Sequence, residues 1–416
     1  MVRPTHAARA FLFAAMAALA SLSAPTHAQL ADADPDLGLL RNNGGAQLVN
    51  GNVRAFAAQG TRKILVGGDF ERTASGIERF SLLRLNADGT LDPDFRVLIA
   101  SAGAVQVNAI VVHGGFIYIG GRFQMVNGAT RPNIAKLTAD GELVEAWRAN
   151  LDGPTDTVHA IAVGADAVYA GGDFTAQDLW GVARLDSQTG AIDPAWRAQT
   201  QAFVTPTPSA SGRGNVRSLL HTGTDLIVGG YFRQIAGQAR ASVARISLTA
   251  PATPSAFDTP VNGGERYAYA LALSPDRSTL YIGGDFFAAN SQQHLLRVNA
   301  QTGAPDTTWK PQPNAQVRAL VLLGPWLYAG GSFSGTTPQP YANLMRLATS
   351  GAGARDTGWL PNPDARVLAL HEDGVRKRLY FGGEFAKVGA SSRNGLARLG
   401  QVIDPDVIFY DAYDIE

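Results

Sequence analysis

The sequence predicts an all-β fold built from repeats, on the basis of two observations. A Gly-Gly-x-Phe motif occurs seven times, and successive copies start 53, 51, 58, 54, 47 and 52 residues apart. No helical period of 3.6 residues continues for more than a turn or two. The invariant positions of the seven copies are Gly67, Gly68 and Phe70; Gly120, Gly121 and Phe123; Gly171, Gly172 and Phe174; Gly229, Gly230 and Phe232; Gly283, Gly284 and Phe286; Gly330, Gly331 and Phe333; and Gly382, Gly383 and Phe385.

Each repeat contains four strand candidates in the same order. In the first repeat, residues 53–56 form the first strand, residues 63–66 run into the glycines, and a third strand ends at Arg84-Leu85. An Asp88-Gly89 turn, which is a strong hairpin signal, opens a short fourth strand that ends in an aromatic residue. The basic residue of the third strand recurs as Arg84, Lys136, Arg184, Arg245, Arg297, Arg346 and Arg398. The terminal aromatic residue recurs as Phe95, Trp147, Trp196, Phe257, Trp309 and Trp359.

Repeats of this length predict a seven-bladed β-propeller of four-stranded antiparallel blades, because closing the ring buries both faces of every sheet. The glycines are expected where sheets approach closely or where φ is positive, since a Cβ would clash there. We expect the motif Phe and the terminal aromatics to fill the wedges between blades. The expected blades are about 51–100, 104–150, 156–198, 214–260, 266–310, 315–361 and 365–410, after an N-terminal segment at 29–50 and before a tail at 411–416.

Two segments are candidates for closing the ring. Asp34-Pro35-Asp36-Leu37 matches the end of a repeat, which predicts that this N-terminal strand pairs with the seventh blade. In the competing interpretation, Asp404-Pro405-Asp406-Val407 completes the seventh blade alone.

Residues 1–28 predict an export signal that is cleaved after Ala28. Arg3 and Arg9 precede a thirteen-residue apolar stretch, and the small residues of a cleavage triplet follow that stretch. The stretch is shorter than the about 20 residues that a transmembrane helix needs. We therefore expect a secreted or periplasmic protein without a membrane span.

Composition excludes several functional classes. Basic and acidic residues balance at 35 each, which leaves no basic surface for nucleic acid. The absence of cysteine excludes a thiol nucleophile, a lipid-anchored cysteine and Cys-ligated metal sites. Neither a metal-ligand spacing of histidines nor a catalytic motif is present, so no cofactor and no metal site are predicted. The residues around Gly89 fit a hairpin turn better than a calcium loop. We expect a monomer.

Residues 83–95, 123–128 and 133–141 resemble the bacterial delta-sixty repeat, because several submotifs recur in order. The resemblance spans residues 51 to 400, and the glycine doublet with the terminal Trp is more distantly similar to kelch repeats. Both resemblances imply a propeller, and neither implies one activity. The fourth repeat departs most, because no Asp-Gly turn or Asp-Pro precedes Phe257.

Two sets of polar residues follow the repeat. The basic residue of the third strand recurs in every copy, which indicates a structural role, with the variable residue of the glycine motif as its expected partner: Asp69, Asp173, Asp285 or Glu384. The second residue of the first strand varies instead, and first strands line the central channel of a propeller. These residues, Arg54, Asn108, His159, Arg217, Tyr269, Arg318 and Leu368, are predicted to form one ring. All but Leu368 are candidate binding residues, and the arginines and histidine suit an anionic group. A water-filled polar tunnel without a ligand is the alternative.

These observations predict a non-enzymatic scaffold that binds protein or polysaccharide through one face or the central channel. One alternative is an exported hydrolase or lyase with its site at the channel mouth, around His159, Arg217 and Arg318. Another is a structural component of the envelope or surface. Loops carry function in many folds, and the longest insertion runs from Thr200 to Gly214.

Overall fold

The computed structural model describes residues 37–42, 48–151, 156–176, 178–201, 212–261, 267–288, 291–336 and 340–400. These residues form strands, turns and bends but no helix, which confirms the expected all-β fold for this part of the chain. It follows that none of them belongs to a helix able to cross a membrane. The predicted signal peptide, the Asp404–Val407 segment, most of the Thr200–Gly214 insertion and the tail lie outside the described residues.

In the described ranges, seven antiparallel sheets share one plan, with the second strand between the first and the third. Their strands, in chain order, are β3 (Asn52–Gln59), β4 (Lys63–Asp69) and β5 (Leu82–Asn86); β7 (Gln106–His113), β8 (Phe116–Arg122) and β11 (Ile134–Thr138); β12 (Thr157–Val163), β13 (Ala167–Ala176) and β14 (Leu179–Asp186); β16 (Asn215–His221), β17 (Asp225–Tyr231) and β20 (Val243–Ser247); β21 (Tyr267–Leu273), β22 (Thr279–Phe287) and β23 (Gln293–Asn299); β24 (Val317–Leu323), β25 (Trp326–Gly335) and β26 (Tyr341–Ala348); and β27 (Val367–Asp373), β28 (Arg378–Gly383) and β31 (Leu396–Leu399).

Short strands form further, smaller sheets. They are β1 (Leu40–Asn42) with β2 (Leu48–Asn50); β6 (Ile99–Ala100), β9 (Met125–Val126) and β10 (Ala129–Thr130); β15 (Thr200–Gln201), β18 (Gln234–Ile235) and β19 (Gln238–Ala239); and β29 (Lys387–Val388) with β30 (Ser391–Ser392).

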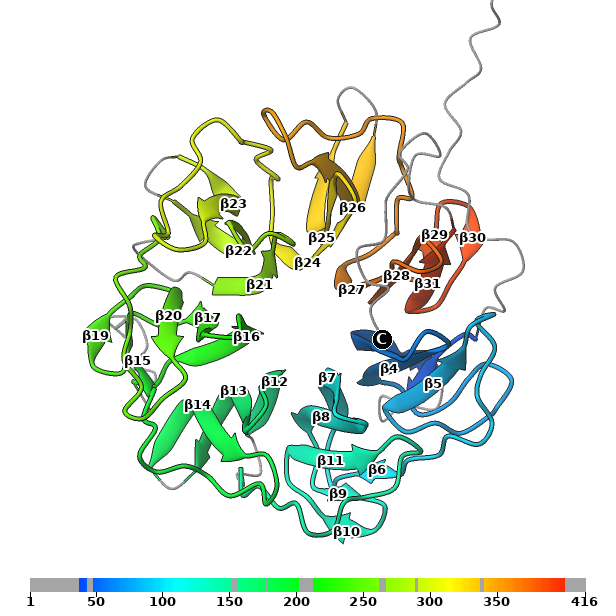
Figure 1. Ribbon diagram of the computed structural model, residues 1–416. Helices are drawn as coiled ribbons and strands as arrows, with labels where there is room; N and C mark the ends of the chain where they lie inside the picture. The colour runs from blue at the N-terminus through cyan, green and yellow to red at the C-terminus, as the bar shows by residue number, and fades with distance from the viewer. Residues whose placement is uncertain are drawn as a thin grey trace, which may run out of the picture.

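The main sheets stand around a common axis, with their first strands innermost (Figure 1). Each first strand contacts the first strand of the next sheet, and β27 of the last sheet contacts β3 of the first. This arrangement is that of a propeller, in which neighbouring sheets supply each other's buried faces.

The first glycine of the motif lies against the next sheet in every repeat except the fourth, where the nearest atom to a Cβ on Gly229 would be Ser218 Oγ of the same sheet. A Cβ placed on Gly67 would lie 2.7 Å from the Cγ1 of Val107 in the next sheet. The same contact joins Gly382 of the last sheet to Val53 of the first. No motif glycine has a positive φ. Close approach, and not backbone conformation, therefore explains the first glycine.

In the first six repeats, the fourth segment is shorter than predicted. After the turn, Leu91 forms a single bridge with Leu85 of β5, and corresponding bridges occur in the next five repeats. In the first repeat, Asp92 adds one backbone hydrogen bond to Arg84 before Pro93, which has no N–H to continue the ladder. The chain then leaves the sheet, and the main sheets have three strands where we expected four.

The terminal aromatics are packed between sheets. Trp147 lies edge-on to Tyr118, with ring centroids 5.9 Å apart, and its Nε1 donates to the Asp186 carbonyl of the following sheet. The equivalent pairs are Tyr169 with Trp196, Tyr281 with Trp309, and Tyr328 with Trp359. These side chains are almost fully buried, as are the motif phenylalanines. The apolar core therefore lies in the seams of the ring.

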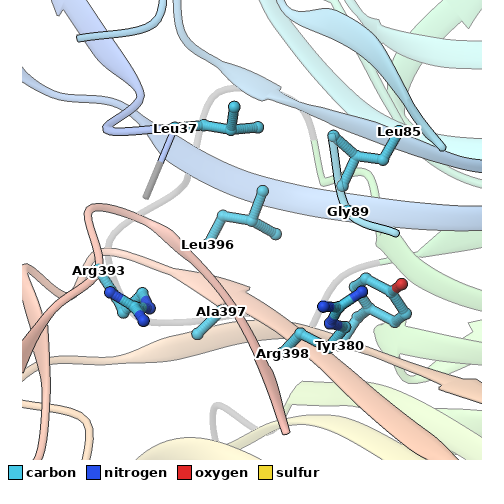
Figure 2. Close-up of a pocket in the computed structure, with 8 residues that line it drawn as sticks. All are labelled: Leu37, Leu85, Gly89, Tyr380, Arg393, Leu396, Ala397 and Arg398. Atoms are coloured by element: carbon cyan, nitrogen blue, oxygen red, sulfur yellow. The ribbon is translucent and has the colours of Figure 1, made fainter. Parts of the chain in front are cut away.

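The N-terminal segment enters the seam between the last and first sheets. Leu40 bridges Arg72 of the first repeat, so β1 pairs within that repeat and not with the seventh sheet. Leu39 is fully buried in a cluster that includes Tyr380 of the last sheet. Leu37 and Leu396 line a small cavity of about 20 Å³ in this seam (Figure 2). Of the predicted closing strand, only Leu37 belongs to the described residues.

Candidate binding site at the centre of the ring

Every first strand contains a β-bulge at the same place. In β3, Val53 pairs with Gly68 and Ala55 pairs with Gly67, so Arg54 has no opposite residue on β4. The extra residues of the other six strands are Asn108, His159, Arg217, Tyr269, Arg318 and Leu368. Bulges re-aim side chains that would otherwise follow the pleat. We call these seven residues the inner ring.

The second glycine of the motif makes room for the bulge. A Cβ on Gly68 would collide with the backbone oxygen of Asn52, two residues before Arg54. The equivalent collision occurs at every second glycine of the motif. The invariant glycine of the second strand therefore permits the bulge that aims a variable side chain of the first strand.

Contacts between neighbouring strands link part of the inner ring. Arg217 Nη1 lies 3.4 Å from His159 Nδ1, and Asn108 Nδ2 donates to the Val158 carbonyl at 3.3 Å. The Arg318 guanidinium lies over the Tyr269 ring, 3.8 Å from its centroid. Arg54 instead pairs with Asp69 of its own sheet, at 3.4 Å.

Charges also act across the axis. Burial holds the pKa of His159 well below its usual value, and repulsion from Arg217 and Arg54 lowers it further. Arg54 belongs to the first sheet and His159 to the third, so they are not neighbours along the ring. The imidazole is therefore neutral at pH 7, and its Nδ1 can accept the hydrogen bond from Arg217.

A tyrosine ladder extends the inner ring, and our sequence reasoning missed two of its members. Tyr231, Tyr267 and Tyr269 stack in order, with centroids 4.8 and 5.2 Å apart. Arg217 lies 5.9 Å from the Tyr267 centroid and Arg318 covers Tyr269. The Tyr-Ala-Tyr alternation of residues 267–269 was the available signal, since alternate residues of a strand share a face.

The two arginines beside this ladder have neutral partners. Arg217 contacts His159, and Arg318 donates to Gln316 Oε1 from Nε at 2.9 Å and from Nη2 at 2.5 Å. No ion pair of either arginine occurs among the described residues, and Arg217 Nε is buried there without a hydrogen-bond partner. Burial is the main cause that lowers the pKa of both side chains.

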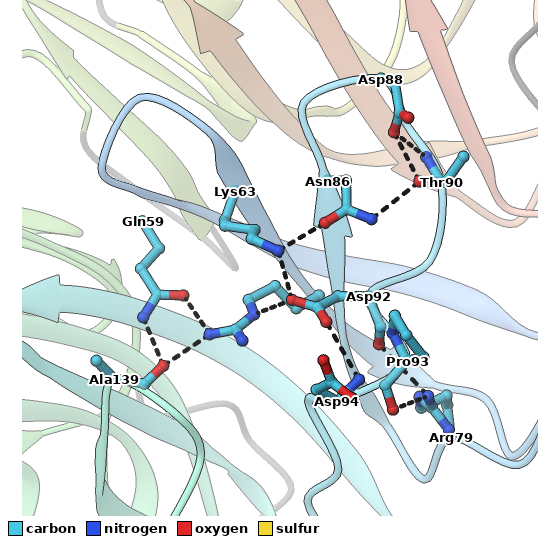
Figure 3. A network of polar contacts seen from close by, with 11 residues as sticks. Gln59, Lys63, Arg79, Asn86, Asp88, Thr90, Asp92, Pro93, Asp94 and Ala139 are labelled. Atoms are coloured by element: carbon cyan, nitrogen blue, oxygen red, sulfur yellow. Dashed lines mark hydrogen bonds and ion pairs between the residues drawn. The ribbon is translucent and has the colours of Figure 1, made fainter.

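Most third-strand arginines, in contrast, form ion pairs with carboxylates. Arg84 Nε donates to Asp92 Oδ2 at 2.8 Å, and Lys63 reaches the same oxygen at 2.7 Å (Figure 3). Comparable ion pairs join Arg184 to Asp193, Arg245 to Asp225, Arg297 to Asp306, and Arg346 to Asp356. Lys136 instead donates to the Ser187 carbonyl.

The predicted pairing of this basic residue with the variable motif residue is therefore wrong. Arg84 lies opposite Leu65 of β4, whereas Asp69 lies four residues further along that strand, about 13 Å away. Asp69 contacts Asn52, Arg54 and Arg41 instead. Glu384 likewise pairs with Arg366, at 3.0 Å.

A cleft of about 900 Å³ lies beside the first two sheets, next to the last residue of β4 and the first residue of β7. Asp69, Arg41 and Gln106 line it, together with the segment 98–105. The Arg41 guanidinium and Asp69 carboxylate are 3.2 Å apart at its wall. The cleft therefore places a mainly apolar surface with a few charged groups near Arg54, which contacts Asp69.

The described residues contain no group of three or more His, Asp or Glu side chains able to hold a metal ion. The histidines of this part of the chain are distributed over separate sheets, and only His159 belongs to the inner ring.

A family model described as "Domain of unknown function (DUF5122) beta-propeller" matches residues 59–95 and 115–143, which lie in the first two repeats. No curated protein matches the chain. The chain is similar to the extracellular domain of a putative hybrid two-component system from B. thetaiotaomicron, with a TM-score of 0.48, 15% identity, and coverage of 87% of this chain and 39% of that one. It therefore spans about two fifths of that protein's chain.

Two other solved structures are similar over most of their own length. The WD40 β-propeller domain of Doa1 has a TM-score of 0.49 and 10% identity, with 84% of this chain and 93% of that chain covered. The computationally designed Ika8 protein has a TM-score of 0.47 and 13% identity, with 85% and 97% covered.

Proposed function

We propose that this chain is an exported, monomeric, non-enzymatic scaffold that binds protein or polysaccharide at the inner ring. In this proposal, residues 1–28 are removed after Ala28, and the mature chain forms a closed seven-bladed propeller of the delta-sixty type. The proposal adds a fourth, reduced strand to each blade, which the single bridges of the first six repeats support.

The observation that carries the proposal is the pair of arginines with neutral partners. Most third-strand arginines have a carboxylate partner, whereas the partly buried Arg217 and Arg318 of the inner ring have no ion pair among the described residues. Such a cation is stabilised when a ligand supplies the missing anion. The inner ring supports the same function, because its side chains differ in chemistry from repeat to repeat. A scaffold with no ligand would need no such particular side chains at these positions.

The test uses the purified mature chain on arrays of bacterial polysaccharides and of secreted proteins. We expect the double substitution Arg217→Gln/Arg318→Gln to lower the affinity for the captured ligand at least about tenfold, because charge-assisted hydrogen bonds are lost. The matched control is Arg148→Gln/Arg197→Gln, which removes the same charge from exposed positions after Trp147 and Trp196.

Two outcomes would overturn the proposal. Ligands whose binding is unchanged by the double substitution would place the site elsewhere. Turnover of a captured polysaccharide, abolished by His159→Gln, would identify a hydrolase or lyase instead of a scaffold.

A further inference from the structure

Four side chains at the centre of the ring form one row of hydrogen-bond donors. Arg217, Tyr267, Tyr269 and Arg318 lie on β16, β21 and β24: the two rings stack, Arg318 lies over Tyr269, and Arg217 lies 5.9 Å from the Tyr267 centroid. The two rings are inclined by only 8°. All four residues are only partly buried, so each keeps some exposed surface.

The rings offer their hydroxyl groups and not their faces. Tyr267 is covered by Tyr231 on one side and Tyr269 on the other, and Arg318 covers the remaining face of Tyr269. Neither Tyr267 nor Tyr269 donates its phenol to another described residue. Burial raises the pKa of Tyr269, so that hydroxyl is a proton donor at neutral pH.

We propose that this row binds an acidic polysaccharide, with uronate carboxylates on Arg217 and Arg318 and sugar hydroxyl or ether oxygens on the tyrosine hydroxyls. The inference rests on the proposed binding function and names its ligand class. A planar guanidinium matches a carboxylate through two parallel hydrogen bonds. Two cations separated by uncharged donors match a polymer that carries carboxylates and hydroxyls along its length.

An acidic peptide fits the row less well. Protein partners are usually anchored by apolar or aromatic side chains in desolvated pockets. The exposed large apolar side chains of the described residues are Leu48, Ile77, Leu98, Met125, Phe287 and Val375, and none of them belongs to the row. The row therefore supplies donors without an apolar anchor.

The experiment measures binding of the mature chain to polygalacturonate, to the same polymer after carboxyl reduction, and to polyglutamate, by titration calorimetry at low and high salt. We expect binding to polygalacturonate that weakens with salt, and at least about tenfold weaker binding to the reduced polymer and to polyglutamate.

Single substitutions then test the row. Arg217→Gln and Arg318→Gln should each weaken polygalacturonate binding at least about tenfold, and Arg318→Lys should not restore it, because an ammonium lacks the planar fork. Tyr269→Phe keeps the stack and removes one donor, so it should weaken binding by about three- to tenfold. The Arg148→Gln/Arg197→Gln control should bind like the original chain, and melting temperatures identify any variant that fails to fold.

The outcomes separate this inference from the function on which it rests. Equal binding of the reduced polymer would overturn the carboxylate assignment. Stronger binding of polyglutamate, lost in the same variants, would replace the polysaccharide with an acidic protein and leave the proposed site intact. Binding of any of the three that ignores both arginine substitutions would overturn the inference and the site together.

Discussion

At the scale of single residues, the fold depends on carboxylates that pair with third-strand arginines, and Asp92 is the buried one among them. Asp92 is 3% exposed and accepts hydrogen bonds from both Lys63 and Arg84. Those two hydrogen bonds hold its pKa at about 2, against the opposing effect of burial. The carboxylate therefore belongs to the packing within the first repeat and not to a ligand site.

We expect Asp92→Asn to lower the free energy of unfolding by about 3–5 kcal/mol at pH 7, because Arg84 then loses its buried anion. Asp94→Asn, two residues away and exposed, should change it by less than about 0.5 kcal/mol. The measurement is urea denaturation from pH 7 to pH 2. A depressed carboxyl pKa stabilises the fold above about pH 4 and less as pH falls toward 2, so the difference between Asp92→Asn and the original chain should shrink over that range. A pH-independent difference would contradict this account.

The glycine doublet gives the second residue-scale prediction. We expect Gly68→Ala to prevent folding or to lower the melting temperature by more than about 10 °C, since its Cβ would strike a backbone oxygen that cannot move without undoing the bulge. Gly103→Ala is the control, because a Cβ there meets nothing within 4 Å and its φ is not positive. Circular dichroism melting compares the two, and similar melting temperatures would show that the glycine is dispensable.

At the scale of elements, the sequence predicted the first three strands of each repeat well and the fourth badly. Alternating apolar residues and the glycine doublet are local signals, so the first and second strands were found within a few residues. The fourth segment was predicted badly because its pairing ends after one bridge in each of the first six repeats, which a hairpin signal such as Asp88-Gly89 does not reveal. In the first and third repeats an Asp-Pro pair follows that bridge directly.

The candidate site was predictable in position but not in its contacts. Counting two residues into each first strand identified Arg217 and Arg318, since the repeat fixes that position. Their partners depend on the order of neighbouring blades and on the bulges, which no single repeat encodes. Tyr231 was missed for this reason, as was the pairing of Asp69 with Arg41 and Arg54, whereas Tyr267 was missed although the alternation of residues 267–269 signalled it.

The N-terminal element gives a prediction at the same scale. Leu39 is fully buried between the first and last sheets, whereas Leu48 of β2 is 43% exposed. We expect Leu39→Ala to cost about 2–5 kcal/mol of unfolding free energy and Leu48→Ala less than about 1 kcal/mol. Chemical denaturation measures both. If Leu39→Ala were as mild as the control, the N-terminal segment would contribute little to the seam.

At the scale of the whole molecule, a ring has one seam that joins sheets distant in sequence. Val53 and Phe56 of β3 meet Gly382, His371 and Tyr380 of the last sheet. The His371 ring stacks on Phe56, 6.4 Å between centroids, and its Nε2 is buried without a hydrogen-bond partner among the described residues. Burial lowers the pKa of His371 to about 4, although Asp373 opposes this.

This seam should weaken in mild acid. The unfolded chain binds a proton at His371 near pH 6.5 and the folded chain only near pH 4, so the stabilisation is complete above pH 6.5 and is lost as pH falls toward 4. Burial raises the pKa of neighbouring Glu372, which acts in the opposite sense, so the comparison must be between variants at one position. We expect His371→Phe to remove about 2–3 kcal/mol of acid destabilisation between pH 7 and 4.5, measured by urea denaturation, with exposed His113→Phe as the control. Hydrogen exchange should show faster opening of β3 and β28 than of β12 and β13 at pH 4.5. If His371→Phe and the original chain lost stability equally, or if all sheets opened together, protonation of His371 would not be what loosens the seam.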